Sequence, residues 1–288
     1  MKKILLATTM LAMTVGYASA EVKISGSARM GLVSDGTDTV FSSRVRIVFD
    51  ATGTTDGGLS FGASMRADQF AGNNAGLGSG GTTNGDSTVF VSGSFGKLTM
   101  GDVAGGAADE LVGQVSLIGY TDLSDNGTAG NINFLGGTAT AVRYDYTSGN
   151  LSVALGTSQT TAPAFFDKNS VAVKYVAGAY TVAVGYETVT GDNQISAKVG
   201  ATFGAATVKL KAAKNSLAGS KTEWAASLDY AVNPALTVTA FYTDHATLGT
   251  KAMGLGASYD LGGGASVVGA VMDDGTNTLA DFGVKMSF

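Results

Sequence analysis

The amino-acid sequence predicts an all-β protein, a transmembrane antiparallel β-barrel of sixteen strands. Apolar and polar residues alternate with a period of two along most of the chain, which is typical of strands with one apolar and one polar face. Short turns alternate with longer polar connections, as in barrels that cross a membrane. The chain also ends in an alternating run, residues 281–288, whose last residue is the aromatic Phe288.

The first twenty residues read as a cleaved signal peptide, so we expect the barrel domain to span residues 21–288. Lys2 and Lys3 form a basic start, a short apolar stretch follows, and Ala18-Ser19-Ala20 is a small-residue cleavage signal. The apolar stretch is too short for a spanning helix.

Composition excludes several classes of function. The 23 acidic residues exceed the 18 Lys and Arg, and this acidic balance argues against nucleic-acid binding. The absence of cysteine excludes disulfides, a thiolate nucleophile and a zinc knuckle. After the signal peptide no stretch of eighteen apolar residues occurs, which excludes helical membrane spans. The 42 glycines and only two prolines suit many strands joined by tight turns.

The alternation marks the strands one after another. In the first, Val22, Ile24 and Met30 share one face while Lys23 and Arg29 share the other. The same test, applied along the chain, predicts strands at residues 22–33, 40–52, 58–69, 87–95, 97–102, 140–147, 150–157, 169–177, 179–188, 194–203, 206–213, 222–232, 235–244, 251–261, 265–273 and 278–288. An even number allows antiparallel closure with both termini on one side, and the short turns are expected on the periplasmic side.

The apolar face of these strands is expected to meet lipid. Arg and Lys occupy the polar face in the middle of strands, which suits a wide barrel with a wet interior rather than a packed soluble core. Closure also pairs every backbone polar group, as lipid requires. Aromatic residues near strand ends on the apolar face fit interfacial girdles: Phe41, Tyr144, Tyr146, Tyr175, Tyr180, Tyr186, Trp224, Tyr230, Tyr242, Tyr259, Phe282 and Phe288.

Four of the five arginines lie on the polar face of the first three strands: Arg29, Arg44, Arg46 and Arg66. If these strands are neighbours, the guanidinium groups form one basic patch inside the pore. The alternative is local pairing of Arg66 with Asp68 and of Arg46 with Asp50. Such ion pairs in water contribute little to stability.

Residues 103–139 are far longer than a hairpin needs, and a long loop in a compact domain is usually functional. The segment is also rich in apolar residues, so we expect it to fold inward, pack against the wall and narrow the pore. Its acids Asp109 and Glu110 would then face the arginines. Opposite charges across a constriction produce a transverse field.

Several stretches resemble the general bacterial porins, in particular their alphaproteobacterial branch. They are residues 21–31, 41–44, 53–63, 95–102, 119–123 and 254–266, with the terminal Phe288. The resemblance implies a homotrimer of sixteen-stranded barrels in the outer membrane, with the third loop inside each barrel. It places Asp109 and Glu110 opposite Arg29, Arg44, Arg46 and Arg66. It also implies that the assembly machinery reads Phe288, and it makes five acids candidate Ca²⁺ ligands: Asp102, Asp109, Glu110, Asp122 and Asp125.

An enzyme is not expected. His245 is the only histidine, which leaves no histidine-based metal cluster, and we expect it at the surface of a loop. A lipase would also need a Gly-x-Ser-x-Gly turn, and none is suitably placed.

We therefore expect a general-diffusion porin, a passive channel for small hydrophilic solutes and ions. Expected partners are membrane lipid and lipopolysaccharide, with no nucleic acid. A non-channel barrel (an adhesin or anchor) and a substrate-specific porin are the alternatives. A wide barrel that side chains cannot fill favours the channel.

Overall fold

The computed structural model describes residues 21–71, 81–83, 87–103, 106–125, 130–135, 141–158 and 168–288. The expected signal peptide, residues 1–20, lies outside these ranges, as do parts of the long loops. No helix in the described ranges is long and apolar enough to cross a membrane.

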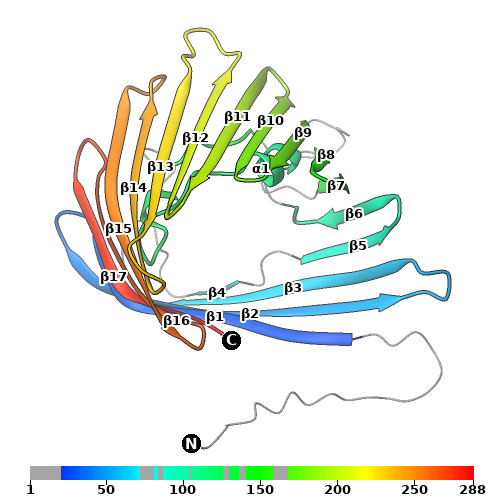
Figure 1. Cartoon of the computed structure of the whole chain (residues 1–288), viewed down its shortest axis with the longest axis horizontal. Helices are drawn as coiled ribbons and strands as arrows, with labels where there is room; N and C mark the ends of the chain where they lie inside the picture. The colour runs from blue at the N-terminus through cyan, green and yellow to red at the C-terminus, as the bar shows by residue number, and fades with distance from the viewer. Residues whose placement is uncertain are drawn as a thin grey trace, which may run out of the picture.

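The described chain is almost entirely β-sheet (Figure 1). The first half contains β1 (Glu21–Ser34), β2 (Thr39–Thr54), β3 (Ser60–Ala71), β4 (Gly81–Thr83), β5 (Ser87–Gly93), β6 (Gly96–Gly101), α1 (Gly106–Leu111), the 3-10 turn η1 (Leu123–Asp125), β7 (Ala141–Ser148) and β8 (Leu151–Ser158). The second half contains β9 (Lys168–Ala177), β10 (Tyr180–Val189), β11 (Asp192–Phe203), β12 (Ala206–Asn215), β13 (Glu223–Ala231), β14 (Leu236–His245), β15 (Thr250–Gly262), β16 (Ala265–Asp273) and β17 (Thr278–Ser287).

Sixteen of these strands form the closed wall, and the prediction of a sixteen-stranded barrel is confirmed. Each strand pairs antiparallel with its neighbour in the sequence, and β3 pairs with β5. The short β4, which lies in an expected loop, only extends the pairing of β3. A strand of three residues is too short to show a recognisable alternation, so β4 could not be predicted from the pattern. The ends of the sixteen wall strands differ from the expected ones by no more than two residues.

The wall closes where β1 pairs with β17. The terminal Phe288 continues this seam, because its amide donates to the carbonyl of Gly26 and its carbonyl accepts from the Gly26 amide, at 3.0 and 2.7 Å. The Phe288 ring covers Gly26, where an added Cβ would lie 2.4 Å from the ring. The last residue therefore joins the first strand, and no free sheet edge remains at the seam.

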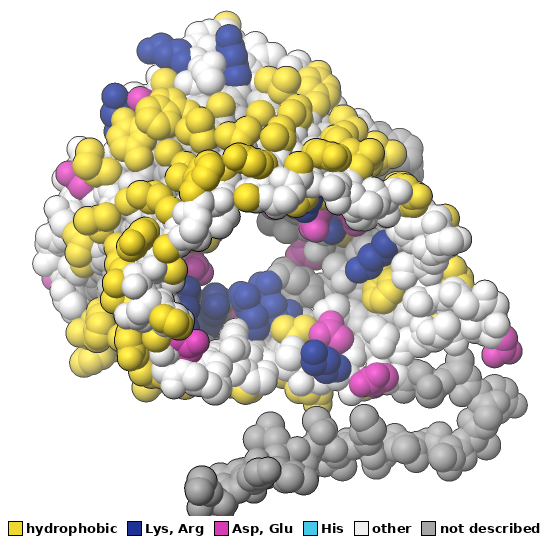
Figure 2. Space-filling view, viewed as in Figure 1, with side chains coloured by type: hydrophobic (Ala, Val, Ile, Leu, Met, Phe, Trp, Pro, Cys, Tyr) yellow, Lys and Arg dark blue, Asp and Glu magenta, His cyan; other side chains and the backbone are white. Residues whose placement is uncertain are grey.

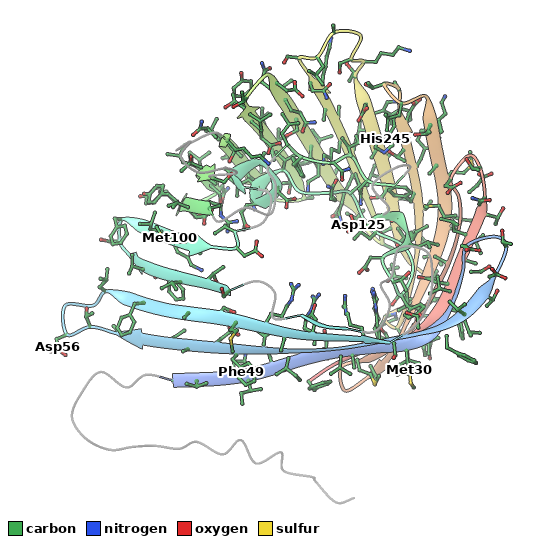
Figure 3. The ribbon with its side chains drawn as sticks, turned by 180° about the vertical axis from the view of Figure 1, so that it is seen from behind. Met30, Phe49, Asp56, Met100, Asp125 and His245 are labelled. Atoms are coloured by element: carbon green, nitrogen blue, oxygen red, sulfur yellow. The ribbon has the colours of Figure 1, made fainter. Side chains whose placement is uncertain are left out.

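Side chains alternate between an apolar outer surface and a polar lumen. Met30 and Phe49 point away from the lumen in Figure 3. Phe41, in the expected aromatic set, is 82% exposed on the isolated barrel. This exposed apolar surface suits contact with lipid.

The described parts of the long segment between β6 and β7, residues 106–125 and 130–135, lie inside the barrel (Figure 1). Its apolar residues Val115, Ile118 and Ile132 are buried. They pack against inward-facing wall residues from β12 to β17: Ala213, Ala225, Phe241, Ala252, Ala270, Met272 and Leu279. The hydrophobic core of this protein thus lies between the inner wall and the loop, and the rest of the lumen surface stays polar.

Candidate functional site

The four arginines expected in the pore come together on neighbouring strands, and we call Arg29, Arg44, Arg46 and Arg66 the arginine cluster. Arg29 on β1 lies directly opposite Arg44 on β2, and Lys285 of β17 is opposite Arg29 on its other side. Figure 2 shows Lys and Arg side chains gathered along the side of the opening that these strands form. Strand register therefore produces a continuous row of cations, Lys285, Arg29 and Arg44, across the seam of the barrel.

Asp68 is the main counter-charge within the wall. Its two oxygens accept from Nε and Nη2 of Arg46 at 2.9 and 3.0 Å, and Arg66 Nε lies 3.2 Å away. Asp68 is 2% exposed. The alternative of local pairing therefore holds for Arg66 with Asp68. Arg46 pairs with Asp68 rather than with Asp50, because β2 and β3 place Arg46 and Asp68 directly opposite each other.

The loop contributes a second carboxylate, Asp122, to the same cations. Asp122 lies 2.8 Å from Lys285 Nζ and 3.8 Å from Arg29 Nη1. Its φ of 63° is the one positive value at a non-glycine residue in the described ranges. A non-glycine residue in this region is uncommon and, when held there, often marks a functional position. Sequence reasoning named Asp122 only as a calcium candidate and did not pair it with the arginine cluster.

Asp281 of β17 holds the loop beside Asp122. Its carboxylate accepts from the Tyr120 amide at 3.1 Å, from the Thr121 amide at 2.8 Å and from Thr121 Oγ1 at 2.6 Å. Gly119 allows this close approach, since an added Cβ would lie 2.6 Å from the carboxylate oxygens. We call Asp281 the loop clamp.

The expected loop acids Asp109 and Glu110 lie on α1, across the lumen from β2 and β3 (Figure 1). Glu110 pairs with Arg143 of β7 at 2.9 Å rather than with the arginine cluster. Arg143 also pairs with Asp145, at 3.0 Å. Burial raises the pKa of Asp109, and Lys211 and Arg143 partly oppose that rise. The helix that carries the two acids thus lies across the lumen from the arginine cluster, and the direct ion pair of Glu110 is with Arg143.

Lysines of β11 and β12 fix the middle of the loop to the opposite wall. Lys211 is fully buried and donates to Gln114 Oε1 and the Ile132 carbonyl, both at 2.7 Å, with its Nζ 3.6 Å from the Phe134 ring centroid. Lys198 donates to the Gln114 carbonyl at 3.1 Å. The alternation placed these lysines on the polar face, but nothing in the sequence indicated that the loop covers them.

The expectation for His245 was wrong. It ends β14 and is 3% exposed, so it is not a surface loop residue. Its Nδ1 lies 3.3 Å from Glu223 Oε2, and its Nε2 lies 3.1 Å from the Gly130 carbonyl. The loop folds over this strand end and buries the imidazole. In the sequence His245 stands next to a polar connection, and that position alone does not indicate burial.

The five candidate Ca²⁺ ligands do not converge. In the described part of the chain no group of three or more His, Cys, Asp or Glu could hold a metal ion. Asp102 and Glu110 lie at the start of the segment, and Asp122 is engaged by Lys285. Asp125 points into the lumen (Figure 3), and burial with neighbouring acids raises its pKa. The residues present do not fit a calcium site, and calcium binding stays a prediction from resemblance alone.

The chain is similar to known porins along most of its length. The family model for Gram-negative porins matches residues 7–279. A porin of Rhodobacter capsulatus is 36% identical, and the match covers 93% of this chain and 100% of that one. A porin of Fuscovulum blasticum is 30% identical with the same coverage of both chains.

Solved porin structures share the architecture. A porin structure refined at 1.8 Å resolution has a TM-score of 0.75 with 35% identity, over 93% of this chain and 100% of that one. A triple mutant of Rhodopseudomonas blastica porin has a TM-score of 0.77, with the same coverage and 23% identity. The relationship therefore extends from the sequence to the closed barrel. The chain belongs to the Gram-negative porin family, of the alphaproteobacterial general type, and is a multi-pass β-barrel of the outer membrane.

Proposed function

We propose that this porin is a general-diffusion channel for small hydrophilic solutes and ions, with its constriction between the arginine cluster and the inward-folded loop. The observation that carries the proposal is the docked loop. It lies in the lumen, and its backbone is held by Asp281 on one side and Lys211 on the other. A sixteen-stranded barrel is too wide for wall side chains to fill, so the loop sets the width of the remaining opening.

Charge on the two sides of this opening supports a screening role. The arginine cluster lines one wall, while Asp109 and Glu110 lie across the lumen on α1. Charges in a channel with low-dielectric walls focus the field on a passing solute. Solute size would then be limited by the loop, and solute charge would be sensed by the facing groups. No chemical step or cofactor is needed for such passive transport.

Planar-bilayer recording tests this proposal. Purified protein should give discrete ohmic steps in KCl, and replacement of residues 112–134 by a short Gly-Ser linker should raise the single-channel conductance. Native-like β content by circular dichroism serves as the folding control. A silent wild-type barrel would favour an adhesin or anchor, and an unchanged conductance after loop replacement would show that the constriction lies elsewhere.

The proposed partners follow from the resemblance and the exposed outer surface. We propose a homotrimer that contacts membrane lipid and lipopolysaccharide, and recognition of Phe288 by the assembly machinery. Phe288 is 65% exposed, so its ring is accessible on the isolated barrel. Crosslinking in native membranes, read as the mass of the crosslinked species, tests the trimer.

A further inference from the structure

Arg44 differs from its neighbours in the arginine cluster. Asp68 pairs with Arg46 and Arg66, and Asp122 pairs with Arg29. Within the part of the chain that the structure describes, the Arg44 side chain makes no hydrogen bond or ion pair, and its Nε is buried without an acceptor. The guanidinium of Arg44 therefore carries donors that no described protein group uses.

The row that contains Arg44 is short of negative charge. Like charges directly opposite each other on paired strands are destabilising. Here Arg29 is opposite Arg44 on one side and Lys285 on the other. Asp122 is the one carboxylate that contacts this row in the described ranges, and its closer contact is with Lys285. The Nε of Arg29 is also buried without an acceptor.

Two adjacent guanidinium groups with unused N–H donors are suited to one kind of ligand. Arginine binds planar carboxylates and tetrahedral phosphates through paired, parallel hydrogen bonds. An oxyanion seated between Arg44 and Arg29 would accept hydrogen bonds from their terminal N–H groups and reduce the repulsion within the row.

We propose that Arg44 and Arg29 form a binding site for the oxyanion group of a small solute, a phosphate or carboxylate, at the channel constriction. The site rests on the proposed channel function and deepens it, because a solute would pause there rather than only pass. Arg44 is the principal ligand, since Arg29 already donates to the Tyr120 carbonyl, at 3.4 Å, and contacts Asp122.

Asp122 acts as the built-in competitor at this site. Its carboxylate neutralises Lys285 and Arg29 from the loop side. Removing that charge leaves the row with a larger positive excess, so an incoming oxyanion should bind more tightly. Asn tolerates the positive φ of this position, and Asp122→Asn therefore keeps the turn.

Block of KCl current by inorganic phosphate tests the site. Recordings at constant ionic strength give the phosphate concentration that halves the single-channel KCl conductance. Arg44→Gln should raise this concentration about tenfold or more, as expected for a lost charge-assisted hydrogen bond. Asp122→Asn should lower it. A matched control is Lys174→Gln, the same charge change on the lumen face of β9, away from the cluster, and it should leave the block unchanged.

The variant Arg44→Lys distinguishes specific phosphate binding from the general electric field of the pore. It keeps the charge and should preserve the reversal potential in a KCl gradient, but it lacks the paired donors and should weaken phosphate block. Equal block in wild type, Arg44→Lys and Arg44→Gln would overturn the site while ordinary KCl conductance upheld the channel. Absence of KCl conductance in the wild type would instead refute the channel itself.

Discussion

The loop clamp allows a quantitative test of how the lumen segment is held. Asp281→Asn keeps the shape of the side chain but removes its charge and one of its two acceptor oxygens. The wild-type carboxylate accepts three hydrogen bonds from Tyr120 and Thr121. An amide has only one acceptor oxygen, so the variant loses either the Tyr120 bond at Oδ1 or the two Thr121 bonds at Oδ2.

The magnitude follows from these contacts. A hydrogen bond to a charged group contributes about 1.5–3 kcal/mol, so the loss of one or two gives about 1.5–6 kcal/mol. Part of this is offset because a neutral amide is less costly to bury than a carboxylate. We expect the free energy of loop docking to fall by about 2–4 kcal/mol, and 3 kcal/mol corresponds to roughly a hundredfold rise in the undocked population.

Single-channel recording measures this change directly. The variant should show frequent excursions to a higher conductance, and residues near Tyr120 should be cut faster by a protease added to the folded protein. Asp260→Asn is the control, because the Asp260 side chain accepts a turn hydrogen bond from the Gly262 amide. Quiet currents and wild-type proteolysis in Asp281→Asn would refute the clamp.

Three further predictions concern the loop and the seam. Burial raises the pKa of Asp109 and of Asp125, so on acidification both are protonated at a higher pH than free aspartate, whose pKa is near 4. Cation preference, read from reversal potentials, should therefore fall over that higher pH range. Asp109→Asn should reduce the size of this fall. Deleting Phe288 removes two backbone hydrogen bonds to Gly26. The amount of this protein in isolated outer membranes should therefore drop, while the channels that do insert conduct normally. An amount equal to that of the wild type would contradict this prediction. His245→Ala removes two ring contacts with Glu223 and the loop, and thermal unfolding should show a loss of about 1–3 kcal/mol; an unchanged transition would exclude a stabilising role.

The wall of this protein was predictable because its signal is local. A strand between lipid and water must alternate, so residues such as Val22 and Lys23 reveal their faces without any tertiary information. The inward path of the long loop was also predictable, from apolar residues such as Val115 and Ile118 that a solvated loop would not carry.

The partners inside the lumen were not predictable, since they depend on strand register and on where the loop lies. Asp68 reaches Arg46 only because the two are directly opposite across β2 and β3. Asp122 meets Lys285, 163 positions later in the chain, and burial of His245 requires the loop to reach β14. Sequence spacing contains no information on such contacts, so the ion pairs of Glu110 with Arg143 and of Asp122 with Lys285 could not be predicted.

The seam has a consequence for the order of events during biogenesis. β17 is the last strand of the barrel to be translated, and it supplies both Asp281 and Lys285. Pairing of β1 with β17 joins the two ends of the chain, the longest sequence separation in the molecule, and such contacts form late because their loop-closure entropy is large. Closing the wall and seating the loop against Asp281 are therefore coupled. A barrel that has not yet closed would therefore lack both its last strand and the carboxylate that seats the loop.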